Sequence, residues 1–157
     1  MNKDLVREKI LAQLRAEHEL QLRAAQVSRD EAIDEESRPE NKYDTHSQEA
    51  AYLAEGQARL AAEIAVSIDL YTALSLPTPT PDSVATLGTL LEVETGKTRS
   101  WYFLGPRAGG LELDVDGRTV LVLTPQSPLG RTLLGKRVGE PVPLPGRKDP
   151  GRLAKLL

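Results

Sequence analysis

The sequence contains no cysteine, which excludes disulfide bonds and every metal site that depends on thiolate ligands. Aromatic residues make up only 4% of the 157 residues, so any hydrophobic core must be built from Leu, Val, Ile and Ala. No apolar run is long enough to cross a membrane, and the charged N-terminal sequence MNKDLVREKI lacks the apolar segment of an export signal. We therefore expect a cytoplasmic protein without a membrane-spanning helix.

Several classes of function are disfavoured by what is scarce. With two histidines and no cysteine, a Ser/His/Asp or Cys/His catalytic set is not plausible. The glycine-rich run at 105–110, GPRAGG, lacks the strand, lysine and helix of a phosphate loop. Trp101, Tyr102 and Phe103 are consecutive, so on a strand they alternate between faces and form no stacking platform. We expect neither an enzyme in its own right nor direct sequence-specific nucleic-acid binding.

What the chain does have is an uneven distribution of charge. The segment 30–46, DEAIDEESRPENKYDTH, contains seven acids and two bases, a local charge of −5 in a chain whose net charge is −3. From residue 131 to the end, seven bases stand against two acids, a local charge of +5. Such a layout can orient a protein on a charged partner. A solvated acidic turn would have the same composition, so charge alone does not decide.

Helical patterns flank the acidic segment on both sides. Residues 3–33 contain no Gly or Pro, and the second helix should begin near Asp44 or Thr45, either of which could cap it, and run to about Leu74. The first helix has a narrow apolar seam consisting of Val6, Ile10, Leu14, Ala24, Ala25, Ser28 and Ala32. The second has a coiled-coil seam consisting of Ala50, Leu53, Gln57, Leu60, Ile64, Ser67, Tyr71 and Leu74. These patterns predict an antiparallel hairpin about 40–45 Å long.

A proline-rich segment separates the hairpin from the rest of the chain. The sequence SLPTPTPD contains three alternating prolines, which cannot continue a helix, and predicts a linker at 76–82. The predicted domains are therefore a coiled-coil hairpin at 1–75, with its acidic tip at about 34–44, and a C-terminal domain at 83–157.

The C-terminal domain has the pattern of a small antiparallel β domain. Strand-like runs at 84–94, 98–106 and 111–124 are separated by turn signals, of which Asp116-Gly117 is the strongest. A short helix is predicted at 127–136, with Ser127 as its N-cap, and two edge strands complete the chain. The fold class is therefore α+β, a helical hairpin followed by a β domain with one short helix.

Two groups of motifs resemble the GreA/GreB family of bacterial transcription elongation factors, and the match covers nearly the whole chain. In the hairpin, Glu40-Asn41, Glu49 and Glu55-Gly56 look like the family's segment after its tip. In the C-terminal domain, SPLGRTLLGK at 127–136, followed by VGE at 138–140, is similar to the family's S-P-x-x-x-A-L-x-G-K-x-x-G-D. The stretch KYDTHSQEAAYLAEGQ resembles a shorter, atypical branch of the family.

The resemblance implies a coiled-coil hairpin joined to an FKBP-like domain. It implies that the C-terminal domain docks at the rim of the secondary channel of bacterial RNA polymerase, with Ser127, Pro128 and Arg131 as the binding residues. The hairpin would enter the channel, and carboxylates at its tip would help to hold a second Mg²⁺ in the polymerase active centre, where the polymerase cuts backtracked RNA. We expect a monomer with no cofactor of its own beyond this shared Mg²⁺.

The tip departs from the family pattern at one position. The family pairs an Asp with a Glu three residues later; Glu40 stands at the Glu position, but Ser37 stands at the Asp position. Glu36 is adjacent and could supply the missing acid, so Glu36 and Glu40 are the predicted catalytic and metal-binding pair. The remaining acidic candidates at the tip are Asp34, Glu35 and Asp44.

The predicted chemistry also follows from general considerations. Two-metal phosphodiester hydrolysis needs a second divalent cation to activate water or stabilise the leaving oxygen. Mg²⁺ keeps several waters, so one or two carboxylates are enough to retain it. Two other interpretations stay open. The chain could be a non-catalytic regulator that occupies the channel and competes with cleavage factors, which Ser37 favours, or a coiled-coil adapter with no polymerase role.

Overall fold

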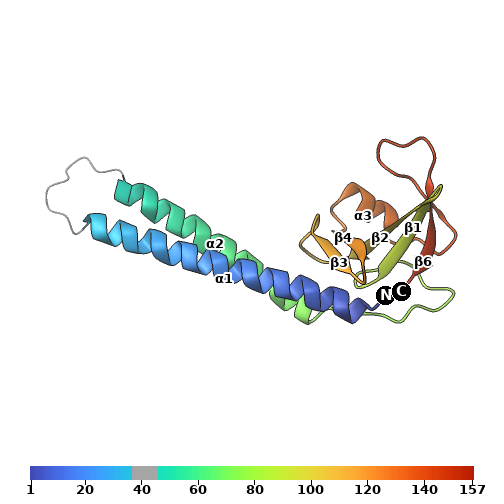
Figure 1. Cartoon of the computed structure of the whole chain (residues 1–157), viewed down its shortest axis with the longest axis horizontal. Helices are drawn as coiled ribbons and strands as arrows, with labels where there is room; N and C mark the ends of the chain where they lie inside the picture. Colours follow the sequence, from blue (N-terminus) through green and yellow to red (C-terminus); the bar gives the residue numbers. More distant parts are fainter. Residues whose placement is uncertain (37–45) are drawn as a thin grey trace. The chain divides into compact units, whose positions relative to one another are not determined.

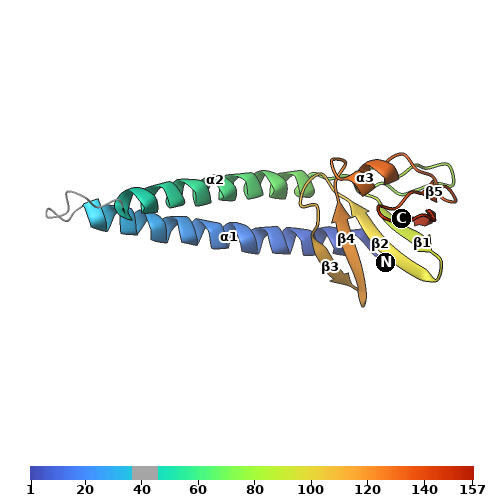
Figure 2. The ribbon, with the colours of Figure 1, turned by 90° about the horizontal axis from the view of Figure 1, so that it is seen from above.

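The computed structural model describes residues 1–36 and 46–157, and the side chains of all of these except Glu35 and Glu36. Two long antiparallel helices lie side by side, α1 (Lys3–Glu36) and α2 (His46–Thr72) (Figures 1 and 2). Their 34 and 27 residues correspond to about 50 and 40 Å of helix. The predicted helical hairpin is confirmed. None of the described helices combines the length and apolar character needed to cross a membrane.

Small side chains form the seam between the two helices in the compact unit that consists of residues 12–69. Its buried members are Ala25, Ser28 and Ala32 on α1 and Ala50, Ala54, Ala61, Ile64 and Ser67 on α2. Across the seam, the Ser28 hydroxyl donates a hydrogen bond to the Gln57 side-chain oxygen at 2.9 Å. Alanine and serine therefore allow the helix backbones to approach closely and leave little room for larger side chains.

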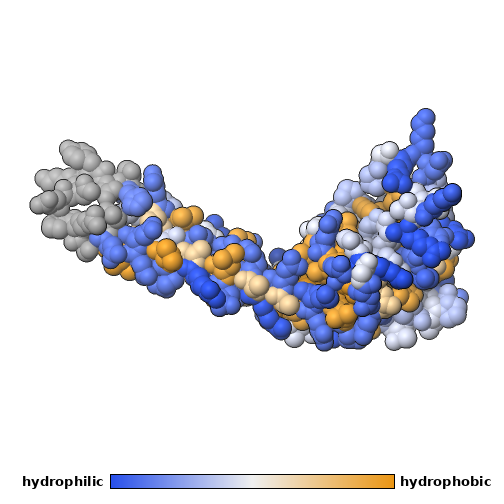
Figure 3. All heavy atoms as spheres, in the orientation of Figure 1, coloured by the Kyte–Doolittle hydropathy of each residue, from blue (hydrophilic) through white to orange (hydrophobic). Residues whose placement is uncertain are grey.

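The predicted seam of α2 is wrong at two positions. Leu53 and Leu60 are 56% and 42% exposed, because the seam runs through Ala54 and Ala61, each one residue later. Where two helix backbones are close enough for alanine side chains to fill the space between them, a leucine side chain does not fit. Both leucines therefore lie outside the buried seam. Figure 3 shows apolar side chains among hydrophilic ones along the helices. Further exposed apolar residues of the helices are Leu20, Leu22, Val27, Ile33, Tyr52 and Val66.

Residues 1–11 belong to a second compact unit, together with residues 70–157. Val6 and Ile10 are completely buried in it. The Arg7 guanidinium donates to the Leu74 carbonyl at 3.2 Å, and the Lys3 ammonium bonds to the Pro77 carbonyl. The first turns of α1 thus hold the start of the proline-rich segment; the boundaries of the predicted linker at 76–82 stay a prediction.

Tyr71 fixes the C-terminal end of α2 to the loop after strand β2 (Thr98–Leu104). The side chain is fully buried, and its hydroxyl donates to the Arg107 carbonyl at 2.6 Å. A Cβ at Gly105 would lie 2.0 Å from this hydroxyl oxygen, so only glycine fits beneath it. Burial raises the pKa of the Tyr71 phenol, which keeps the hydroxyl protonated as a donor.

We expect Tyr71→Phe to lower the free energy of unfolding by about 1–2 kcal/mol, because it leaves the Arg107 carbonyl without its donor. Tyr52→Phe, at an exposed position, should leave the free energy of unfolding unchanged. Because the raised pKa favours the neutral phenol in the folded state, the contribution of Tyr71 is present below its ordinary pKa near 10 and is lost as the pH rises further. Urea titrations should therefore show the difference between wild type and Tyr71→Phe narrowing above about pH 10; a constant difference would contradict this account.

The C-terminal part contains a β-sheet and one short helix, as predicted; the sheet has six strands in the order β3-β4-β2-β1-β6-β5 (Figures 1 and 2), and it is not purely antiparallel as expected. The elements are β1 (Leu90–Thr95), β2 (Thr98–Leu104), β3 (Glu112–Val115), β4 (Arg118–Leu123), α3 (Pro128–Leu133), β5 (Pro141–Val142) and β6 (Gly151–Leu156). Asp116 and Gly117 both have positive φ and form the predicted turn between β3 and β4. The sheet is mixed, because β2 and β4 pair in parallel while all other pairs are antiparallel. The further description of this domain as FKBP-like stays a prediction.

The core lies between one face of this sheet and α3. Its buried members are Ala85, Leu91, Val93, Leu104, Leu123, Leu133, Val142 and Leu153. The predicted strand at 84–94 begins only at Leu90, because Gly88 adopts a φ of +83° and packs against the Ser75 carbonyl. Residues 84–89 therefore form a loop that connects the proline-rich segment to the sheet.

Candidate functional site

The Ser-Pro motif forms the short helix α3, and its N-terminus is capped as the sequence predicts. The Ser127 hydroxyl accepts a hydrogen bond from the Gly130 amide at 3.0 Å and donates one to the Thr124 carbonyl at 2.9 Å. Pro128 occupies the first helical position, where no amide hydrogen is needed. Ser127 is thus a half-buried structural residue that fixes where the helix begins.

Gly130 is the second residue that this helix depends on. A Cβ at this position would lie 1.9 Å from the Thr124 carbonyl oxygen and 2.7 Å from the Ser127 hydroxyl oxygen. The helix can therefore approach the end of β4 and receive its cap only if residue 130 has no side chain.

Backbone hydrogen bonds also hold the residues that follow the C-terminal end of α3. The amide of Gly135 donates to the Ala85 carbonyl, and the Ala85 amide donates to the Lys136 carbonyl, each at 2.8 Å. The Arg137 guanidinium also reaches the Asp82 carbonyl at 3.0 Å. The motif and the loop before β1 thus form one rigid corner of the domain.

The outer side of this corner is exposed. Pro128 and Arg131, three residues apart on the helix, are both exposed, and Arg131 makes no ion pair with the described part of the chain. Leu134 and Val138 follow, with 43% and 53% of their surface exposed. The surface that consists of Pro128, Arg131, Leu134 and Val138, here named the α3 surface, combines apolar area with one positive charge.

The other predicted site is the acidic end of the hairpin. Asp34, near the end of α1, is exposed. Asp34 and His46, the first residue of α2, each interact with other residues of the chain. The backbone of residues 35 and 36 completes α1. The side chains of Glu35 and Glu36, and Glu40 and Asp44 entirely, lie outside the described residues. The predicted pairing of Glu36 with Glu40 therefore stays a prediction.

Acidic residues at this end oppose the electrostatics of the helix. The last turn of α1 contains Asp34, Glu35 and Glu36 and no basic residue. The C-terminus of a helix carries partial negative charge, so each of these carboxylates is unfavourable there, by about 0.3–1 kcal/mol when ionised. The sequence keeps acids at a position where they do not stabilise the helix.

The donor types at this end fit Mg²⁺, which prefers carboxylate oxygens and water. In residues 1–34 and 46–157, no group of three or more His, Asp or Glu side chains gathers to hold a metal ion.

No family model matches the sequence, and no curated protein matches it. Among solved structures, the chain is similar to GreA factor homolog 1 (Gfh1) of Thermus thermophilus, with 22% identity over 96% of this chain and 94% of that one and a TM-score of 0.40. A second structure of the transcription factor Gfh1 gives 23% identity, 96% and 92% coverage, and a TM-score of 0.40. Gfh1 of Thermus aquaticus gives 24% identity, 95% and 92% coverage, and a TM-score of 0.36.

Sequence reasoning missed two parts of the α3 surface and its support. Gly130 falls at an unspecified position of the motif, and only the distance to the Thr124 carbonyl reveals why it is glycine. Leu134 and Val138 have the apolar character of core residues, and the sequence offers no signal that they are exposed after the end of α3.

Proposed function

We propose that the chain is a Gre-type transcription factor that binds bacterial RNA polymerase at its secondary channel. In this proposal the α3 surface docks at the channel rim, and the acidic hairpin tip reaches the active centre to modulate elongation. The polymerase supplies the catalytic machinery, and this chain supplies position and carboxylates. The carboxylates of the tip would serve stimulation of Mg²⁺-dependent cleavage of backtracked RNA.

The observation that carries the proposal is that some residues of the Ser-Pro motif are structural while others are exposed. Ser127 and Gly130 hold the helix in place, whereas Pro128 and Arg131 make no contribution to the core and are exposed. Apolar side chains beside an exposed arginine, on a hydrogen-bonded corner, are typical of a protein-binding surface. This agrees with the motif's resemblance to the polymerase-docking segment of the family.

The hairpin tip supports the second half of the proposal. Acids in the last turn of α1 are unfavourable for the helix, so a role outside folding accounts for them better than stability does. A slender hairpin, closely packed through Ala25, Ala54 and Ala61, suits entry into a narrow channel.

Glu36 and Glu40 would hold the shared Mg²⁺ in the complex, and the ion would supply activation of water or stabilisation of the leaving oxygen. The chain's own residues would add negative charge next to this cation. One or two carboxylates are enough for this purpose, because Mg²⁺ keeps most of its water ligands.

A second candidate function is a non-catalytic regulator that occupies the same channel. Ser37 favours it, because a hydroxyl stands where the family has a carboxylate and provides no charge for Mg²⁺. Both candidates share the docking surface. They differ in whether the wild-type chain shortens the RNA of a stalled, backtracked complex in Mg²⁺: shortening above that of polymerase alone selects the first candidate, and slowed elongation without shortening selects the second.

The docking step is tested by replacing the exposed residues of the motif and leaving its structural ones intact. We expect Pro128→Ala with Arg131→Ala to weaken binding to core polymerase at least tenfold, because the variant loses the one charge and the proline of the α3 surface. The melting temperature should change little, since neither side chain is buried. Binding can be measured by fluorescence anisotropy of the labelled chain.

Pro145→Ala with Arg147→Ala is the matched control, since both residues are exposed and lie outside the α3 surface. It should bind as wild type does. Equal affinity of the two double variants would contradict docking through α3, and failure of the wild-type chain to bind polymerase would favour the adapter interpretation.

A further inference from the structure

The face of the sheet opposite α3 contains a group of charged residues around one tryptophan. Strand register places Glu92 between Trp101 and Lys155, and Glu94 between Arg99 and Arg152. Arg118, at the start of β4, lies over the Trp101 ring, with its guanidinium carbon 5.6 Å from the ring centroid. Four strands, β1, β2, β4 and β6, thus contribute side chains to this group, here named the Trp101 cluster.

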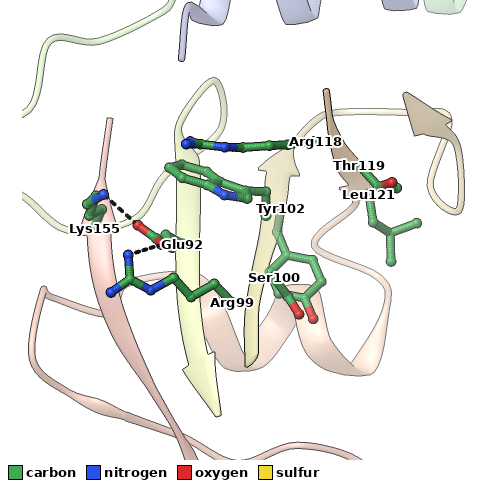
Figure 4. A pocket seen from close by; sticks show the side chains of 9 residues that line it. Glu92, Arg99, Ser100, Tyr102, Arg118, Thr119, Leu121 and Lys155 are labelled. Carbon is green, nitrogen blue, oxygen red and sulfur yellow. Dashed lines mark ion pairs between the residues drawn. The ribbon is translucent and has the colours of Figure 1, made fainter. Parts of the chain in front are cut away.

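Glu92 is the buried carboxylate with which two cations of the cluster form ion pairs. Its side chain is only 2% exposed, and its carboxylate receives Arg99 at 3.4 Å and Lys155 at 2.9 Å (Figure 4). The oxygen that faces Lys155 makes no hydrogen bond with the described residues, because the ammonium lies at hydrogen-bond distance but outside hydrogen-bond geometry. A buried carboxylate with an incompletely satisfied oxygen is costly, so its retention points to a role in holding the two cations in place.

The cations are in excess. Arg99, Arg118, Arg152 and Lys155 stand against Glu92 and Glu94, which leaves a net charge of +2 on this face. Arg118 has no ion-pair partner within the described ranges, and its position over the ring leaves its N–H groups available. Lys155 lies 5.7 Å from the same ring, so the tryptophan orients two cations at once.

A cavity of about 550 Å³ opens at this group. Arg99, Arg118 and Lys155 line it together with the hydroxyl-bearing residues Ser100, Tyr102 and Thr119 (Figure 4). The volume lies in the range of small-molecule sites, about 300–1,000 Å³. The lining supplies many hydrogen-bond donors and a positive charge, which suits an anion and disfavours an apolar ligand.

We propose that the Trp101 cluster is a binding site for a small phosphorylated ligand. A phosphate group carries a charge of about −1.5 to −2 near neutral pH, which matches the excess of two positive charges. Guanidinium groups bind phosphate oxygens in pairs, and Arg118 is presented for this by the ring beneath it. The charged residues of the Trp101 cluster lie on the sheet face opposite α3, and no residue that lines the cavity belongs to the α3 surface, so the proposal does not depend on polymerase binding.

The experiment uses Trp101 itself as the probe, because it is the only tryptophan in the chain. The full chain is titrated with inorganic pyrophosphate and with ATP while tryptophan fluorescence is followed, and calorimetry confirms the stoichiometry. We expect a saturable change with one site per chain. Arg118→Gln should weaken this binding at least tenfold, because it removes a charge-assisted contact without breaking an ion pair.

Lys148→Gln is the control, since it removes the same charge from an exposed position outside the cavity. It should bind pyrophosphate as wild type does. No saturable binding of either probe, or equal weakening by Lys148→Gln, would overturn the proposal. Saturation by a glutamate-rich peptide or by single-stranded RNA, without pyrophosphate or ATP binding, would also overturn it and assign the surface to a macromolecule. Circular dichroism of Arg118→Gln excludes misfolding as the cause of lost binding.

Discussion

Gly130→Ala is expected to lower the free energy of unfolding of the C-terminal part by about 3 kcal/mol, the largest effect of any single methyl group considered for this chain. The added Cβ would lie 1.9 Å from the Thr124 carbonyl oxygen, so α3 or the end of β4 must move. Either movement disturbs the hydrogen bonds that Ser127 makes to Thr124 and Gly130. The loss should appear as a lower urea midpoint, and it should also weaken polymerase binding, because the α3 surface shifts.

Gly56→Ala is the matched control, because it adds the same methyl group to another helical glycine. No atom lies within 4 Å of a Cβ at Gly56, on α2. Alanine has the higher helix propensity, so this variant should gain up to about 1 kcal/mol. A loss of stability in Gly56→Ala, or none in Gly130→Ala, would contradict the packing described for α3.

Neutralising the hairpin tip is expected to remove the effect on the polymerase without weakening the fold. In Glu36→Gln with Glu40→Gln, two carboxylates proposed to contact Mg²⁺ become amides, which are poor ligands beside a carboxylate. RNA shortening in a backtracked complex should fall at least tenfold, and binding at the rim should persist because the α3 surface is unchanged. The thermal stability of the hairpin should stay the same or rise, since Glu36 lies in the last turn of α1 and opposes the helix dipole.

Glu63→Gln with Asp69→Asn provides the control for this experiment. Both acids are exposed on α2, away from the tip residues in sequence, and the variant makes the same change in net charge. It should retain full activity. A tip variant that is as active as this control would remove the basis for a metal-related role of Glu36 and Glu40.

The helical hairpin could be predicted from the sequence because a long run without Gly or Pro, with apolar residues at spacings of three and four, has few other solutions. The residues of the α2 seam are harder to predict from the sequence. Leu53 and Ala54 compete for the same side of the helix, and hydrophobicity favours leucine, whereas the closely packed helices select alanine. That choice depends on the distance between two helices, which is a property of the pair and not of either sequence pattern.

The candidate sites show the same division. The Ser127 cap and the Pro128 position follow from local rules, so the sequence predicts them correctly. Trp101 was expected only as part of a strand, and its relation to Arg118 and Lys155 depends on a parallel pairing of β2 with β4 and on β6 returning to β1. Those strand pairings join residues far apart in the chain, and no local sequence pattern predicts them.

The central claim is that the tip of this hairpin reaches the active centre of RNA polymerase. Because the chain has no cysteine, Ser37→Cys provides a single attachment point for a photo-crosslinker at the tip. The labelled chain is bound to a backtracked polymerase complex, and the crosslinked polymerase residues are identified by mass spectrometry. The account predicts crosslinks next to the catalytic centre, lost when Pro128 and Arg131 are replaced. Crosslinks confined to the outer surface of the polymerase, or none despite binding, would contradict it.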